Sequence, residues 1–233
     1  MTQRLRITYS KNGPARYVAH LDMMRTWERA LRRAKLPLAY SQGFSPHARI
    51  AMAAPLPVGT LGEREQMDVL FSEGVELRDA HDRLAAALPD GVAVVAIEEV
   101  GERLPSLQSS VRAAHYLVRF DADAVDAAAL GEQVAELMAL ETLDWQEQRG
   151  GSDKVRRYDL RAAVIELTLR EEGELVELAM HLALEDGRTG RPASVLAALG
   201  VEAEPLEVVR TALEVERPKL AMRAWRESGR GEE

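Results

Sequence analysis

The sequence contains no cysteine. This absence excludes disulfide bonds, thiolate zinc sites, cysteine nucleophiles and iron–sulfur clusters held by this chain. Aromatic residues make up only 5% of the chain. No apolar run approaches the ~20 residues that a membrane-spanning helix needs, and the first residues, MTQRLR, lack the apolar stretch of a signal peptide. We therefore expect a soluble, cytoplasmic protein.

Negatively charged residues outnumber positively charged ones overall, but the positive charge is concentrated at one end of the chain. The 233 residues carry a net charge of −8. Residues 1–50 contain ten Lys or Arg against two Asp or Glu, a net of +8, so the remainder carries −16. A cationic segment on an acidic protein predicts a local site for a polyanion, and phosphate is the obvious candidate. The overall acidity argues against a protein that coats nucleic acid along its whole surface.

The spacing of apolar residues in the first hundred residues predicts the order β-α-β-β-α-β, which is typical of ferredoxin-like domains. The predicted strands are residues 5–9, 49–53, 65–71 and 92–100, and the predicted helices are residues 21–35 and 76–88. In the first helix, Leu21, Met24, Trp27 and Leu31 form one apolar stripe, and Pro37 prevents its continuation.

The same order recurs in the second half of the chain. The predicted strands are residues 115–120, 157–170, 174–184 and 208–215, and the predicted helices are residues 123–140 and 192–199. Residues 101–112 are polar and aperiodic, as in a linker. We therefore predict an α+β fold of two tandem ferredoxin-like domains, residues 1–104 and 111–217. A C-terminal tail, residues 218–233, follows, in which Trp225 suggests a short docked helix.

Arginines follow one another along the first predicted helix. Arg25, Arg29, Arg32 and Arg33 recur at intervals of three and four residues, so they line one helix face. Other cations lie nearby in the sequence: Arg4, Arg6, Arg16, Lys35 and Arg49. Helix and strand could present these charges together to a phosphate backbone. The alternative is an ordinary solvated face, screened by Glu28 and by distant carboxylates.

The segment that follows this helix combines aromatic and hydroxyl side chains around a glycine. If exposed, Tyr40 and Phe44 could stack on unpaired bases, while Ser41, Ser45 and backbone amides bind phosphate. The alternative is that both aromatic rings fill the core and that Gly43 makes a turn.

Histidines are the remaining candidates for chemistry. His20 and His47 lie where the chain changes direction, and either could act as an acid–base, a phosphate donor or a metal ligand. Asp22 is the only obvious third ligand, and structural hydrogen bonding is the competing explanation. His115 and His181 fall in strand patterns and are predicted to be packing residues. We predict no catalytic residue, no metal ligand and no cofactor, because no nucleophile accompanies these rings.

Residues 16–60 resemble the hallmark segment of the radical SAM-linked protein family, a bacterial domain family of unknown function. The shared motifs are His20-Leu21-Asp22, the arginine-rich helix, Tyr40-Ser41-x-Gly43-Phe44-x-Pro46-His47 and Pro55-Leu56-Pro57-x-Gly59. One departure is Ala19, where a serine is common. The resemblance implies a radical SAM enzyme as partner, because members are encoded beside or fused to one, and that partner would hold the iron–sulfur cluster and S-adenosylmethionine. It identifies no catalytic residue.

These observations favour a non-catalytic accessory protein that binds RNA, such as tRNA or ribosomal RNA, for its radical SAM partner. The residues predicted to bind RNA or the partner are Arg16, His20, Arg25, Arg29, Arg32, Arg33, Tyr40, Ser41, Phe44, His47 and Arg49. Two alternatives remain open. The basic region could dock the partner enzyme or its peptide substrate, or the chain could be an RNA endonuclease that uses His20 or His47 as acid–base.

Overall fold

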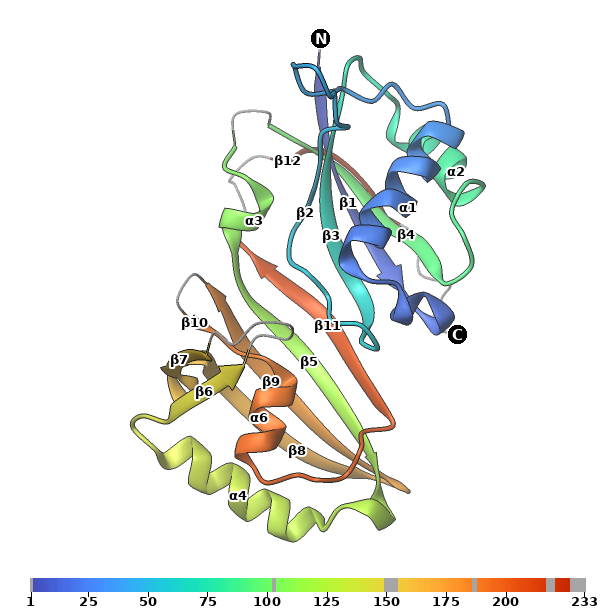
Figure 1. Cartoon of the computed structure of the whole chain (residues 1–233). Helices are drawn as coiled ribbons and strands as arrows, with labels where there is room; N and C mark the ends of the chain where they lie inside the picture. Colours follow the sequence, from blue (N-terminus) through green and yellow to red (C-terminus); the bar gives the residue numbers. More distant parts are fainter. Residues whose placement is uncertain (1, 102–103, 149–154, 186–187, 217–220, 227–233) are drawn as a thin grey trace. The chain divides into compact units, whose positions relative to one another are not determined.

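The computed structural model describes residues 2–101, 104–148, 155–185, 188–216 and 221–226 (Figure 1). The chain divides into two compact units: unit 1 comprises residues 1–111 and 215–233, and unit 2 comprises residues 112–214. Helices and antiparallel strands alternate in both units, so the protein is α+β, as predicted. None of the helices in the described ranges is long and apolar enough to cross a membrane.

Unit 1 is an antiparallel sheet with helices. Its strands are β1 (Gln3–Lys11), β2 (Ile50–Met52), β3 (Leu61–Phe71), β4 (Val92–Val100) and β12 (Ala221–Arg226). Its helices are α1 (His20–Arg33), α2 (Leu77–Ala85) and α3 (Leu107–Ser110), with a 3₁₀ turn, η1 (Gly13–Tyr17). β1 lies between β3 and β4. β2 pairs with the other edge of β3, and β12 pairs with β4.

The core of unit 1 lies between one face of this sheet and the helices α1 and α2, which lie on the same side of it (Figure 1). Alternation along β1 directs Leu5, Ile7 and Tyr9 to that face, because successive side chains of a strand point to opposite sides. Trp27 and Leu31 of α1 are fully buried against them. Burial of this stripe fixes which face of α1 remains in solvent.

A left-handed residue, Lys35, ends α1. Its φ of 51° is the only positive φ of a non-glycine residue in the part of the chain that the structure describes. The Leu36 amide donates to the Leu31 carbonyl at 3.2 Å, and the Lys35 amide donates to the Arg32 carbonyl at 3.0 Å. This pair of bonds is the Schellman motif, which satisfies carbonyls at a helix end. The helix therefore stops at Arg33, four residues before Pro37.

Unit 2 repeats the order of helices and strands with an added hairpin. Its strands are β5 (Val111–Asp121), β6 (Asp144–Gln148), β7 (Val155–Asp159), β8 (Val164–Glu172), β9 (Leu175–Glu185), β10 (Arg188–Thr189) and β11 (Glu207–Val215). Its helices are α4 (Ala127–Ala139), α5 (Leu160–Ala163) and α6 (Pro192–Ala198), with a 3₁₀ turn, η2 (Ala122–Ala124). The strand order is β8-β9-β5-β11, and β6 pairs with β7 separately. Tyr116, Val118 and Phe120 of β5 are buried.

The single strand predicted over residues 157–170 is wrong. The chain forms β7, turns through α5 and continues as β8. The turn is held by Asp159, whose carboxylate accepts hydrogen bonds from the Leu143 amide at 2.9 Å and the Ala162 amide at 3.3 Å. These backbone hydrogen bonds favour the ionised form and lower the pKa of Asp159. Asp159 thus caps the N-terminus of α5 at a point where the pattern of apolar residues predicts one uninterrupted strand.

The docked helix predicted around Trp225 is also wrong, because residues 221–226 form β12. This segment pairs antiparallel with β4 from Ala221 opposite Val100 to Arg226 opposite Ala96. An edge strand presents unpaired amide and carbonyl groups, and another strand satisfies them in a way that a helix cannot. Within the predicted linker 101–112, residues 107–110 form α3, and Leu107 is fully buried.

Candidate nucleic-acid interface

The solvent face of α1 carries four arginines. Arg25, Arg29, Arg32 and Arg33 are all exposed, whereas Trp27 and Leu31 of the predicted apolar stripe are buried. The prediction that Leu21 belongs to the buried stripe is wrong, because its side chain is exposed. The separation follows from the period of 3.6 residues, which places positions four apart on one side of a helix. Arg32 and Arg33 also lie in the last turn, where positive charge is favoured by the helix dipole.

Two of these arginines form ion pairs within the helix. Arg25 lies 3.0 Å from Asp22, and Arg32 lies 2.7 Å from Glu28. Exposed pairs of this kind contribute only about 0–1 kcal/mol, so an incoming phosphate can compete for both guanidinium groups. Arg29 and Arg33 make no ion pair with any residue in the described ranges. The α1 face thus keeps a surplus of positive charge.

The loop between Tyr40 and Ala48 projects from unit 1 and is closed at its base. Tyr40 and Ala48 form an isolated antiparallel bridge. The Ser41 amide donates to the His47 carbonyl at 2.9 Å, and the Ser41 hydroxyl accepts from the His47 amide at 3.0 Å. Ser41 and His47 therefore shape the loop, although both remain exposed.

Phe44 lies at the tip of this loop and is fully in solvent, with a relative exposure of 108%. The alternative that Phe44 fills the core is therefore wrong. Tyr40 is 39% exposed. A ring that is fully exposed to water gains none of the favourable free energy that burial of its apolar surface would give. Stacking on a ligand supplies that burial.

Arg32 connects the helix face to the loop. Its guanidinium carbon lies 5.7 Å from the centroid of the Tyr40 ring, within the range of a cation–π contact. Arg49, at the other side of the loop base, is exposed but lies on the sheet face opposite α1, where it lines a cavity with Arg4 and Asp68. The expectation that Arg49 joins the α1 charges is therefore wrong. The arginine face of α1 thus contacts the base of the loop that carries Phe44 at its tip. We call Arg25, Arg29, Arg32, Arg33, Tyr40 and Phe44 the basic–aromatic surface.

The other predicted residues have different surroundings. Arg16 is half-buried, with its guanidinium 5.3 Å from the centroid of the Tyr17 ring. His20 is half-buried at the first position of α1.

Arg4 and Arg6 are not part of the basic–aromatic surface. They leave β1 on the face opposite α1 and pair with Asp68 of β3. The expectation that these two arginines join the α1 charges is therefore wrong. The carboxylate that pairs with them lies on β3, which is next to β1 in the sheet but more than 60 residues away in the sequence, so local patterns do not reveal it.

His115 and His181, which the strand pattern predicts to be packing residues, stack on each other on the sheet face away from the buried Tyr116 and Val118. They lie opposite each other on β5 and β9, with side chains 42% and 19% exposed. Their rings stack with centroids 4.1 Å apart, next to Glu214. One signal was available, because His115 alternates with buried Tyr116 and Val118 and so points to the other face. The register that brings in His181 was not predictable from the sequence.

This α+β chain belongs to a family described as an uncharacterized protein conserved in bacteria (DUF2344). The family matches residues 4–192, which include all of α1 and the Tyr40–Ala48 loop. No curated protein matches the chain.

Three solved structures illustrate what the fold is similar to. A chain from the crystal structure of a Cbf5-Nop10-Gar1 complex has a TM-score of 0.50 at 12% identity, covering 90% of this chain and 48% of that one. A chain of the archaeal box H/ACA sRNP Nop10-Cbf5 complex has a TM-score of 0.44 at 13% sequence identity, and the match covers 90% of this chain and 47% of that one. An unknown protein from Galdieria sulphuraria has a TM-score of 0.28 at 14% sequence identity, and the match covers 86% of this chain and 91% of that one. The chain spans about half the length of the first two, and the first likeness shows the fold alone.

Proposed function

We propose that the chain is a non-catalytic RNA-binding protein that holds single-stranded RNA on the basic–aromatic surface of unit 1. The observation that carries this proposal is the fully exposed Phe44 on a loop whose base residue, Tyr40, contacts Arg32 of the exposed arginine face of α1. The resemblance of residues 16–60 to radical SAM-linked proteins supports a radical SAM enzyme as the partner that acts on the RNA. The matching strand order in units 1 and 2 supports two tandem ferredoxin-like domains as the scaffold.

Single-stranded RNA fits this surface because it offers both of the groups that the surface recognises. Guanidinium groups bind phosphate by charge-assisted hydrogen bonds. Unpaired bases expose flat faces that stack on Phe44 and Tyr40. An acidic peptide would use the arginines but leave Phe44 in water, and duplex RNA would hide its base faces.

Charge reversal of α1 tests the phosphate contacts. Replacing Arg25, Arg29, Arg32 and Arg33 with glutamate is expected to weaken RNA binding and to flatten its salt dependence. Each lost phosphate contact removes about 0.7 from the slope of log K against log salt for a single strand. Fluorescence anisotropy with a mixed-sequence RNA oligonucleotide, repeated over a salt series, measures both quantities.

A matched control separates the surface from total charge. Reversing four exposed arginines of unit 2 changes the net charge by the same amount: Arg112, Arg157, Arg170 and Arg188. This variant should keep most of the wild-type affinity and slope. Equal losses in the two variants would contradict the proposal. Absence of RNA binding in the wild type, with co-purification of a protein that survives nuclease, would instead favour the partner-docking alternative.

Phe44 tests the base contacts independently of charge. Phe44→Ala is expected to weaken binding by roughly 1–3 kcal/mol if one base stacks there. The substitution leaves stability unchanged because the side chain packs on nothing. Phe44→Trp should retain affinity, and Leu206→Ala, at an exposed apolar residue of unit 2 (58%), should have no effect. An unchanged affinity for Phe44→Ala would remove stacking from the mechanism.

A further inference from the structure

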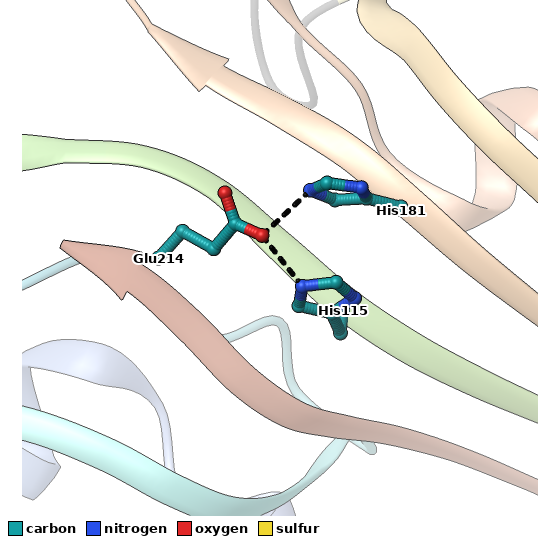
Figure 2. A group of neighbouring side chains, drawn as sticks. All are labelled: His115, His181 and Glu214. Carbon is teal, nitrogen blue, oxygen red and sulfur yellow. Dashed lines mark hydrogen bonds and ion pairs between the residues drawn. The ribbon is translucent and has the colours of Figure 1, made fainter.

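Three strands of unit 2 bring together two imidazoles and a carboxylate (Figure 2). His115 on β5 lies directly opposite His181 on β9, and Glu214 projects from β11 toward both rings. One carboxylate oxygen, Oε1 of Glu214, lies 2.8 Å from Nε2 of His115 and 3.0 Å from Nε2 of His181. Within the described ranges this is the only group of three His, Asp or Glu side chains that could share a metal ion.

The hydrogen bonding of this cluster is incomplete. Nε2 of His115 forms a hydrogen bond with Glu214, whereas Nε2 of His181 is buried and forms no hydrogen bond with any described residue, although it lies 3.0 Å from the same oxygen. A buried polar nitrogen without a hydrogen bond is unfavourable by about 1–3 kcal/mol. Two neutral imidazoles and one carboxylate supply three lone pairs at one point. A cation at that point satisfies all three.

The neighbouring carboxylates do not compete for these histidines. On the same sheet face, Arg119 donates to Glu177 at 2.6 Å and to Glu207 at 2.7 Å. Hydrogen bonds to Glu177 and Glu207 raise the pKa of the Arg119 guanidinium, so this group stays charged and holds both carboxylates. Glu214 is consequently the carboxylate that faces the imidazole pair. Glu166 of β8, opposite His181 in register, adds negative charge next to it.

We propose that His115, His181 and Glu214 bind a divalent transition-metal ion of the zinc type. Two imidazole nitrogens and one carboxylate oxygen are a donor set that Zn²⁺ accepts, with bonds of about 2.0–2.2 Å. Their donor atoms all lie within 4.8 Å of one another. Coordination needs the two stacked rings to turn so that their lone pairs converge. The χ2 torsion of histidine is broad, which permits this turn in half-exposed side chains.

A site with three protein ligands keeps a coordination position for water or a small ligand. His115 and His181 line a cavity of about 360 Å³, which is also bordered by Thr168, Arg170 and Thr211. The proposed ion goes beyond RNA binding, since it lies in unit 2 and needs none of the residues of the basic–aromatic surface.

Zinc titration of the chelator-treated, tag-free full chain tests this site. Isothermal titration calorimetry should show one Zn²⁺ per chain. His115→Ala, His181→Ala and Glu214→Gln should each weaken binding by at least about tenfold, because even outer partners of metal ligands contribute that much. Substitution by Co²⁺ should give the visible absorption bands of a low-coordinate nitrogen–oxygen site.

His81 provides the matched control. Its Nδ1 lies 2.9 Å from the carboxylate of Asp82. Among the described residues, however, His81 belongs to no group of three side chains that could hold a metal ion. His81→Ala should leave zinc binding unchanged. In the wild type, ¹⁵N spectra should place zinc on Nε2 and the proton on Nδ1 of both His115 and His181. No zinc uptake by the wild type, or an equal loss in His81→Ala, would overturn the proposal.

Discussion

Replacement of Trp27 by alanine is expected to lower the free energy of unfolding of unit 1 by about 3–5 kcal/mol. Trp27 is fully buried and packs edge-to-face on Tyr9, with ring centroids 5.0 Å apart. α1 has four buried side chains, and this is by far the largest of them. Its loss leaves a cavity that small neighbours such as Ala30 cannot fill. Urea unfolding followed by circular dichroism measures the change.

Trp27→Phe separates packing from hydrogen bonding. Nε1 of Trp27 is buried and has no hydrogen-bond partner among the described residues. Phenylalanine keeps a ring next to Tyr9 and removes this unpaired donor, so it should destabilise the protein less than alanine does. Both variants also affect the basic–aromatic surface, because the same helix carries its arginines. A loss in Trp27→Ala no larger than that of an exposed-site substitution would contradict the burial.

The regular elements of the fold were predictable because their signals are local. The segment 92–100 matches β4 at both ends, and 192–199 differs from α6 by one residue. In both, an apolar segment is bounded by residues that begin or end regular structure: Pro89-Asp90-Gly91 precedes β4, Pro192 begins α6 and Gly200 follows it. The β6–β7 hairpin was not predicted. Its strands pair Trp145 with Tyr158 but expose most of their other side chains, so they show no alternation of apolar and polar residues.

The candidate site was predictable to the same extent. The arginine face of α1 follows from spacing along one helix, and the structure exposes all four side chains. The position of Phe44 did not follow, because an aromatic residue in a glycine-containing loop packs inward or outward depending on the rest of the fold. The cluster of His115, His181 and Glu214 depends on strand register over almost a hundred residues.

The same limit applies to Arg4 and Arg6, whose partner Asp68 lies 64 and 62 residues away. Asp68 accepts from both: Arg6 donates through Nε at 2.8 Å and through a terminal nitrogen at 3.1 Å, and Arg4 donates through Nε at 3.0 Å. The Arg6 and Asp68 side chains are each only 5% exposed. Arg4 also donates to the Leu104 and Pro105 carbonyls. One carboxylate thus accepts hydrogen bonds from two guanidinium groups beneath the chain segment that follows β4.

Asp68→Ala is therefore expected to lower the free energy of unfolding by about 3–5 kcal/mol, because it leaves buried arginine charge without a partner. Urea unfolding at neutral pH measures the loss. Asp79→Ala is the control: it removes a carboxylate that is 55% exposed and pairs with Arg83 at 2.8 Å, and it should lower stability by no more than about 1 kcal/mol. Replacing Asp68, Arg4 and Arg6 together with leucine should be less destabilising than Asp68→Ala, since no unpaired charge remains. Equal losses for Asp68→Ala and Asp79→Ala would show that the pair on β1 and β3 is solvated, and that Arg4 and Arg6 remain available to a polyanion.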